Sequence, residues 1–424
     1  MGSVTMKCLM RWGRSSGHII TMILIVLLLT GATITWAADD QVDLGLMIGF
    51  TGDMGPWAPA ISNAAIVAVE EINLDGGILG KKVKLWSADN ESTVEGGIRG
   101  AKKLVAVNKV SAIIGPESDP IMALLDFAKE TKTPIISTSA GTMALDKAGG
   151  TGNYIYRTNA SDSFLGIVTA KLIYEGLDIK ECAVITENLE GTMSAAETMI
   201  KNYEKLGGKI VSKAVLAPGQ ATYHSELKKV FGKKPAMTFL ATGEVTGVNV
   251  IKQWYQKGYG GEWWVSTDLQ NQEFIQSSGM EVTKGVRSQV SSQKEGDPGW
   301  TRFAARYEKR WNEKAEPGAY QSNTYDAVII AALAMEAAKD TSGESVDKHL
   351  IAVSSPPGKK VFSFKEGAAA LQNGEEINYE GASGPVDFNQ YGNVTMPVSR
   401  ILRVTDKGEW VTEKVLDSSQ FIAD

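Results

Sequence analysis

The chain is poor in the residues that many catalytic and metal sites require. Its 424 residues include only two cysteines and three histidines. Once an N-terminal leader is set aside, Cys182 is the only cysteine left, so an intramolecular disulfide is excluded. Cys182 lies in a strand-like apolar run and is predicted to be a small buried side chain. His224 and His349 are far apart in sequence with no paired ligands near them, so we expect no metal site.

Sequence motifs of catalysis are missing as well. There is no G-x-S-x-G nucleophile elbow and no G-x-G-x-x-G after a strand. Residues 76–82 have a passing likeness to a Walker loop, but the spacing and the final Ser or Thr are absent. Paired carboxylates remain a route to catalysis because Asp and Glu are abundant, although abundance alone is weak support. We therefore expect a protein that is not an enzyme and needs no cofactor.

The chain also lacks an excess of basic charge. It has 49 acidic and 43 basic residues, for a net charge of −6, and loss of the leader would remove three positive charges and leave −9. Lysines and glutamates are scattered, as on solvated helix faces, and do not form blocks. An acidic chain of this kind is a poor match for nucleic acid, which requires a basic face.

The first 37 residues have the order of a secretory signal peptide. Basic residues come first, residues 19–29 form an apolar run interrupted only by Thr21, and small residues precede a cut that fits best after Ala37. The alternative is an uncleaved anchor, because residues 19–36 are just long enough to span a bilayer. Cys8 lies too early for a lipid anchor at the cut. We expect export to the periplasm.

Strand-like and helical periodicities alternate along the rest of the chain. Strands are expected at residues 42–48, 82–86, 112–115, 133–137, 182–185, 210–215, 237–241 and 263–266, with a hairpin of residues 401–405 and 410–415 at the end. Helical spacing lies between them. This alternation predicts mostly parallel sheets with helices on both faces. The pattern restarts after Arg157 without a Pro/Ser-rich linker, which favours two α/β lobes joined by a hinge.

The loops beyond the carboxyl ends of these strands are the candidate binding site, because ligands of parallel α/β sheets lie there. Residues 115–120 and 137–142 are consecutive loops of this kind, and both offer hydroxyls and backbone N–H groups near helix starts. Such loops hold a carboxylate without an arginine. The alternative is that their Ser and Thr residues only cap helices.

Two further loops contribute candidates. Asp268 follows the strand predicted at residues 263–266, where it is placed either to pair with an ammonium group or to cap the following turn. Trp57 follows the first strand, where it either covers an apolar part of the ligand or packs at the edge of a lobe.

Several stretches together resemble the leucine/isoleucine/valine-binding protein family, which are type I periplasmic binding proteins of ABC importers. The matching stretches cover nearly the whole mature chain: residues 50–57, 68–81, 113–118, 134–140, 156–158 and 384–393. The resemblance implies two doubly wound parallel-sheet lobes joined by three hinge crossings, near residues 157–159, 285–287 and 385–387. Lobe one would then be residues 40–158 plus 287–385, and lobe two residues 159–286 plus 386–424.

The resemblance also assigns parts of the site. It implies that Ser118 and the loop with Ser139, Ala140 and Thr142 bind a ligand carboxylate, and that Asp268 takes the ligand ammonium. A small amino acid or a related polar solute is the expected ligand.

The sequence departs from the family at two positions in the second lobe. Glu190 stands where the family has a Tyr, and Glu244 stands where an aromatic residue is common. These acids either suit a basic or amide-bearing ligand or face solvent, and other branches of the family carry amides, urea or aromatic acids.

The partners that the resemblance implies are a small solute and an ABC permease in the inner membrane, with the binding protein acting as a monomer. The alternative is a sensor that presents the solute to a receptor, because a fold does not fix a function.

Overall fold

The computed structural model describes residues 41–421 except 295, 317, 319 and 397. The predicted signal peptide, with its cut after Ala37 and with Cys8, lies outside the described residues. Within the described residues, no helix is both long and apolar enough to cross a membrane.

The first sheet consists, within the described residues, of six parallel strands in the spatial order β14-β5-β4-β3-β1-β2. Its strands are Gln41–Ile48 (β1), Lys82–Asp89 (β2), Ala112–Ile114 (β3), Ile135–Ser137 (β4), Ile155–Ala160 (β5) and Asn393–Val394 (β14). The central strands β3 and β4 are buried along their whole length. They therefore read as short continuous apolar runs, which is typical of a parallel sheet covered on both faces.

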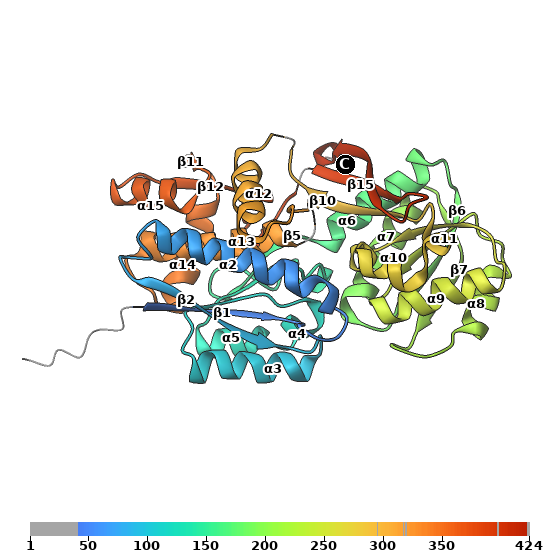
Figure 1. Ribbon diagram of the computed structural model, residues 1–424, viewed down its shortest axis with the longest axis horizontal. Helices are drawn as coiled ribbons and strands as arrows, with labels where there is room; N and C mark the ends of the chain where they lie inside the picture. Colours follow the sequence, from blue (N-terminus) through green and yellow to red (C-terminus); the bar gives the residue numbers. More distant parts are fainter. Residues whose placement is uncertain (1–40, 295, 317, 319, 397, 422–424) are drawn as a thin grey trace, which may run out of the picture. The chain divides into compact units, whose positions relative to one another are not determined.

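Helices cover both faces of the first sheet. They are Ala58–Leu74 (α2), Val94–Lys102 (α3), Ser118–Met122 (α4), Leu125–Thr131 (α5), Pro298–Trp311 (α12), Gln321–Ala338 (α13), Gly343–Ser354 (α14) and Phe364–Gln372 (α15). Figure 1 shows α2 on one side of β1 and β2 and α3 on the other. Residues 118–131 form two helices, α4 and α5, and α3 continues as a π-helical turn, Lys103–Val107.

The second sheet has the spatial order β16-β15-β10-β9-β8-β6-β7. Its strands are Glu181–Glu187 (β6), Lys209–Leu216 (β7), Met237–Ala241 (β8), Glu262–Val265 (β9), Arg287–Ser292 (β10), Val398–Val404 (β15) and Trp410–Asp417 (β16). Strands β6 to β10 pair in parallel, whereas β15 pairs antiparallel with β10 and β16. The two antiparallel strands form the hairpin that the sequence predicts at the end of the chain.

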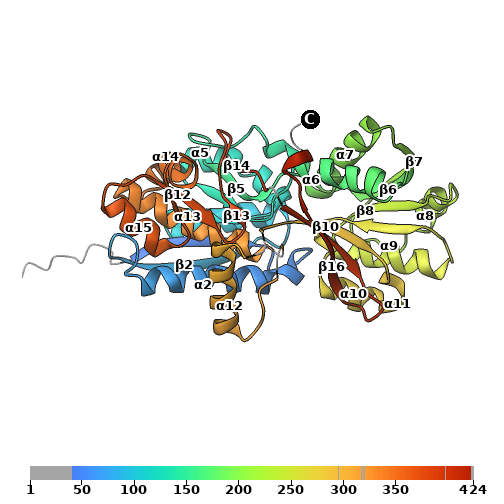
Figure 2. The same ribbon diagram turned by 90° about the horizontal axis from the view of Figure 1, so that it is seen from above.

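The helices around the second sheet also form two layers. They are Asp162–Lys171 (α6), Glu190–Lys205 (α7), His224–Phe231 (α8), Glu244–Gln256 (α9), Gln272–Ser278 (α10) and Met280–Thr283 (α11). Figure 2 shows α6 and α7 on one side of β6 and β8, and α9 and α10 on the other. The side chains of the two layers form separate apolar cores. A small third sheet holds Lys359–Val361 (β11), Ile377–Gly381 (β12) and Gly384–Pro385 (β13).

The chain passes between the two large sheets after β5, after β10 and after β14. We infer that the first lies after Ala160, because β5 pairs with β4 and β14 up to that residue, close to the crossing predicted at residues 157–159. We infer from the strand pairings that the second lies after Ser292, because β10 pairs with β9 and β15. We likewise infer that the third lies after Val394, because β14 pairs with β5. The predicted crossings at residues 285–287 and 385–387 would move accordingly, while the lobe boundaries themselves stay a prediction.

A buried ion network fastens three helices over the first sheet. Glu71 on α2 is fully buried and contacts Arg302 and Arg306 of α12 at 3.0 Å each. Its other polar contact is with α13, where Tyr325 donates a hydrogen bond of 2.7 Å to Glu71 Oε2. Since a buried carboxylate is tolerated only when it is paired, this network holds α2, α12 and α13 together.

We predict that Glu71→Ala lowers the free energy of unfolding by about 3 kcal/mol, because two arginines and a buried hydroxyl lose their partner. Urea denaturation measures this loss. The neighbouring Glu70→Ala is the matched control, because Glu70 pairs with Arg310 at 2.9 Å on the exposed face of the same helix. That substitution should cost less than about 1 kcal/mol. Equal losses for the two variants would contradict the role given to Glu71.

Candidate functional site

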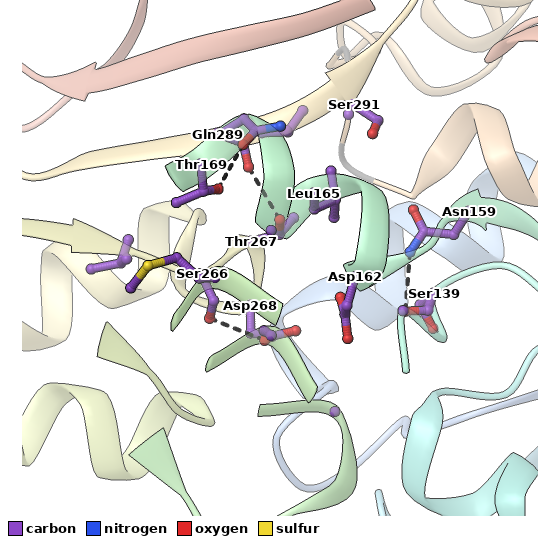
Figure 3. Close-up of a pocket in the computed structure, with 18 of the residues that line it drawn as sticks. Ser139, Asn159, Asp162, Leu165, Thr169, Ser266, Thr267, Asp268, Gln289 and Ser291 are labelled. Carbon is purple, nitrogen blue, oxygen red and sulfur yellow. Dashed lines mark hydrogen bonds between the residues drawn. The ribbon is translucent and has the colours of Figure 1, made fainter. Parts of the chain in front are cut away.

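A cavity of about 810 Å³, which includes space open to solvent, lies at the carboxyl ends of strands from both sheets (Figure 3). Its polar wall contains the side chains of Ser118, Ser139, Asn159, Asp162, Thr169, Ser266, Thr267, Asp268, Gln289, Ser291, Tyr320 and Asn323. The first sheet contributes the loops after β3, β4 and β5, and the second contributes the loop after β9 and the strand β10 itself. The cavity is therefore where the rule for parallel sheets places a ligand.

A second cavity of about 560 Å³ adjoins the first and shares four lining residues with it: Ser118, Ser139, Gly191 and Asp268. Three carboxylates of the first sheet's loops line it as well, namely Asp53, Glu117 and Asp119. Thr192 and Gly243 face them from the second sheet's loops. The two cavities therefore adjoin, and together they are called the cleft.

Ser137 links the two hydroxyl-bearing loops that the sequence predicts to bind a ligand. Its hydroxyl donates to the carbonyl of Pro116 and accepts from the backbone N–H of Ala140 at 2.9 Å. Ala140 is fully buried and does not line either cavity, because its amide is directed at Ser137. The predicted carboxylate contact at Ala140 therefore has no free backbone donor in this structure.

Ser118 and Ser139 line both cavities. Ser118 Oγ accepts a long hydrogen bond of 3.3 Å from the backbone N–H of Thr142. Ser139 Oγ is enclosed and has no hydrogen-bond partner. Since buried polar groups are nearly always paired, this unpaired hydroxyl marks a place in the wall where a polar partner would fit.

Arg157 on β5 supports the second loop from behind and does not line either cavity. Its guanidinium is buried and donates to the carbonyls of Gly141 and Thr142 at 3.0 and 2.9 Å. It also pairs with Asp146. The arginine thus fixes the shape of the loop without offering its charge to the cleft.

Asp268 lines both cavities, as the sequence predicts for an acid after β9. Its carboxylate accepts a hydrogen bond of 3.1 Å from Ser266 Oγ. The pKa of Asp268 is raised to about 6, mainly by burial and also by the charges of Asp53 and Asp119, against the hydrogen bond from Ser266, which lowers it. Trp57 donates its indole N–H to the backbone carbonyl of Asp268 at 3.2 Å, so it lies beside the cleft but is not part of its wall.

Asp162 is a cleft residue that the sequence interpretation missed. It is the first residue of α6, directly after β5, and its side chain is only 8% exposed. Figure 3 shows it on the cavity wall between Asp268 and the pair formed by Ser139 and Asn159. Its Oδ2 has no hydrogen-bond partner. Burial raises the pKa of Asp162 to about 7; a hydrogen bond with the Ser194 side chain and the charge of Arg157 lower the pKa, whereas the charge of Asp268 raises it.

Tyr320 and an apolar wall complete the first cavity and were also missed. Tyr320 precedes α13 with a φ of +58°, a conformation that a bulky residue rarely adopts. Its ring packs edge-on against Trp57 at 5.3 Å between centroids. The far end of the cavity is lined by the apolar side chains of Leu165, Met199, Phe239, Trp264, Val265 and Val290. This end suits an aliphatic or aromatic part of a ligand.

Hydrogen bonds connect the two lobes at the rim of the cleft. Glu190, at the start of α7, accepts from Thr142 Oγ1 at 2.6 Å, and its backbone N–H donates to Asp119 at 3.0 Å. Met143 N donates to Ser194 Oγ at 2.8 Å. Glu190 and Thr142 line neither cavity, since each is the other's partner.

Glu244 also lines neither cavity. It is the first residue of α9, is 7% exposed, and accepts a hydrogen bond of 3.0 Å from Asn271. Burial raises the pKa of Glu244 to about 7. It contributes to the negative potential near the cleft but does not present its carboxylate to the cavities.

The cleft is strongly acidic. Within the described residues, no Lys, Arg or His side chain lines either cavity, whereas five carboxylates do. The pKa of each of them is raised, first of all by burial: Asp53, Glu117, Asp119, Asp162 and Asp268. Such a cleft favours a ligand that brings positive charge, because buried carboxylates require a partner.

Comparison with known proteins gives the family. The model of the family described as periplasmic binding protein matches residues 41–409. The chain belongs to the periplasmic binding protein family. This match, together with the two lobes and their mostly parallel sheets, confirms the family resemblance and the type I fold that the sequence predicts.

Two relatives and one solved structure show the range of this periplasmic binding protein's neighbours. The Leu/Ile/Val-binding protein BraC3 of Rhizobium johnstonii is 23% identical over 359 residues, covering 84% of this chain and 90% of that protein. BasB, a substrate-binding protein of a chemotactic signal transduction system in Halobacterium salinarum, is 25% identical over 395 residues, covering 91% and 92%. LivJ of Streptococcus pneumoniae, solved with isoleucine, is 21% identical with a TM-score of 0.74, covering 89% and 99%.

We predict that the solute-free protein becomes more stable as the pH falls from 7.5 to 5. Asp162, Asp268 and Glu117 hold their protons more tightly in the folded protein than in the unfolded chain, because their folded pKa values are raised to about 6 or 7. Their stabilising contribution is complete below pH ~4 and is lost as the pH rises through 6 to 7. The gain should be on the order of 1–3 kcal/mol, measured by urea denaturation at each pH.

The variant Asp162→Asn should flatten this pH dependence, whereas the substitution Asp126→Asn on the exposed face of α5 serves as its control. A stability that rises steadily from pH 5 to 7.5 in the unmodified protein would contradict the assignment of raised pKa values in the cleft.

Proposed function

We propose that this protein is an exported solute-binding protein of an ABC importer, and that it binds a small amine-bearing solute, an amino acid or a close relative, in the cleft. The observation that carries the proposal is the pair of carboxylates, Asp162 and Asp268, beside the free hydroxyl of Ser139. The carboxylates suit an ammonium group, and the hydroxyls suit the polar remainder of an amino acid. We further propose that the protein works in the periplasm as a monomer and catalyses no reaction.

The proposed mechanism is closure of the two lobes on the solute. Ser118 and Ser139 stand on loops of the first sheet, while Asp162 at the start of α6 and Asp268 after β9 stand on the second lobe. A solute drives closure only if it makes better contacts in the closed state than in the open one. A solute whose ammonium group contacts Asp162 and Asp268 while its polar remainder contacts Ser118 and Ser139 meets this condition, and the closed form would then dock on a permease in the inner membrane.

A sensor that presents the solute to a receptor is the second candidate function. It is favoured by the similarity to BasB, which belongs to a chemotactic signalling system. Uptake of labelled solute by a deletion strain separates the two. Loss of uptake supports the importer, whereas intact uptake with lost chemotaxis supports the sensor.

The solute class is tested by a thermal-shift panel of amino acids, amines, amides, urea and aromatic carboxylates. A true ligand raises the melting temperature by mass action, and hits are then measured by calorimetry. The proposal expects amine-bearing compounds among the hits. Binding of benzoate or urea with no response to any amine would reject the amine-bearing class.

We predict that Asp268→Asn weakens binding of an amine-bearing solute about 10- to 100-fold, because a buried charge-assisted hydrogen bond is lost. Calorimetry measures the change, with Asp126→Asn as the control that keeps the affinity of the unmodified protein. An affinity that Asp268→Asn leaves unaltered would remove Asp268 from the site.

A further inference from the structure

The second cavity is more acidic than one ammonium group explains. Asp53, from the loop after β1, lies there with Glu117 and Asp119, which flank Ser118 in the loop after β3. Asp268 and Asp162 already face each other's charge in the first cavity. One ammonium group beside Asp162 and Asp268 leaves the acids of the second cavity without a counter-charge.

The hydrogen bonds that Glu117 and Asp119 accept leave their negative charges without a cationic partner among the described contacts. Glu117 accepts a hydrogen bond of 3.0 Å from Asn90 at Oε2, but its enclosed Oε1 has no partner. Asp119 accepts from the backbone N–H groups of Glu190 and Gly191 at 3.0 and 3.5 Å. Of the two acids, only Asp119 therefore accepts hydrogen bonds from the N-terminus of a helix, α7, which carries a partial positive charge.

Asp53 reaches from the first lobe to the backbone of the second. A Cβ atom at Gly243 would lie 2.5 Å from the carboxyl carbon of Asp53, so no larger residue fits there without a shift. Gly243 in turn donates its N–H to Glu187 at 2.7 Å. The carboxylate of Asp53 thus lies against the backbone of Gly243, and the nearby charged side chain of the second lobe is another acid, Glu187.

The two cavities adjoin at Asp268, Ser118 and Ser139, which line both. Asp162, more than nine-tenths buried, lines the first cavity, and Glu117 lines the second. One carboxylate oxygen of each, Asp162 Oδ2 and Glu117 Oε1, has no hydrogen-bond partner. Among the described residues, no group of acids is arranged to hold a metal ion. An organic cation is therefore the occupant that this end of the cleft fits.

We propose that the solute carries two cationic nitrogens, one between Asp162 and Asp268 and the second among Asp53, Glu117 and Asp119. This inference rests on the proposed function and narrows its solute class to dicationic amines. A basic amino acid and a short diamine share this chemistry; they differ in the carboxylate, which only the amino acid brings to Ser118 and Ser139.

Calorimetry with matched pairs of probes tests the proposal. L-lysine is compared with L-norleucine, L-ornithine with L-norvaline, and putrescine with n-butylamine, because each pair differs in a single cationic nitrogen. The dicationic member of at least one pair should bind about 10- to 100-fold more tightly, since a charge-assisted contact is added. A preference for putrescine over lysine and ornithine assigns the site to diamines, and the opposite order assigns it to basic amino acids.

Two variants locate the second nitrogen. Asp53→Asn and Glu117→Gln should each lower the ratio of dication to monocation affinity at least about fivefold, because each removes a negative charge beside it. Asp126→Asn controls for a lost surface charge. Thermal unfolding of each variant checks that it is folded, and with two variants the test does not depend on one of them.

The outcomes separate this inference from the function it rests on. Equal affinity for both members of every pair overturns the second cationic subsite while leaving an amine-binding protein. A preference for dications that neither variant reduces overturns its placement at Asp53 and Glu117. Tightest binding by a neutral or anionic solute, or no binding of any amine, overturns the proposed solute class and the inference with it.

Discussion

The cleft is governed by one electrostatic constraint: carboxylates of two lobes line it, and among the described residues no Lys, Arg or His side chain lines it with them. Asp162 and Asp268 line the first cavity, and Asp53, Glu117 and Asp119 line the second. Burial raises the pKa of each, because burial makes their negative charges unfavourable. A cation that enters between them relieves this cost in both lobes at once, and it can thereby couple binding to closure.

The scaffold makes this arrangement possible by fixing the loops on which the acids stand. Each loop follows the carboxyl end of a strand, so loops distant in sequence converge on one cleft. Ser137 ties the loop after β3 to the loop after β4, and Arg157 holds the second loop through its carbonyls. Because Arg157 pairs with Asp146 behind the loop, its positive charge does not neutralise the cleft, which stays acidic.

The fold was predictable because segments with the apolar spacing of strands alternate with segments that have the apolar spacing of helices along nearly the whole chain. Ser118, Ser139 and Asp268 were found by the rule that ligands lie beyond strand ends. The same rule applies to Asp162 after β5, but a Ser-Asp pair at a helix start reads as an ordinary cap, and Ser161 does cap α6. Glu190 and Glu244 were expected either to suit a ligand or to face solvent. Instead, Glu190 accepts a hydrogen bond from Thr142, and Glu244 accepts one from Asn271. Because both partners are distant in sequence, no local pattern shows where these carboxylates point.

The most direct test of the account is a measurement of closure by energy transfer between dyes on the two lobes. Cysteines at Glu130 of α5 and Lys229 of α8 are exposed labelling sites, and the native Cys182 is buried. At pH 8 the account predicts low transfer in the solute-free protein, a rise when the amine solute binds, and high transfer without solute in the double variant Asp162→Asn/Asp268→Asn. A double variant that shows no more transfer than the solute-free parent would contradict the claim that repulsion among these carboxylates opposes closure.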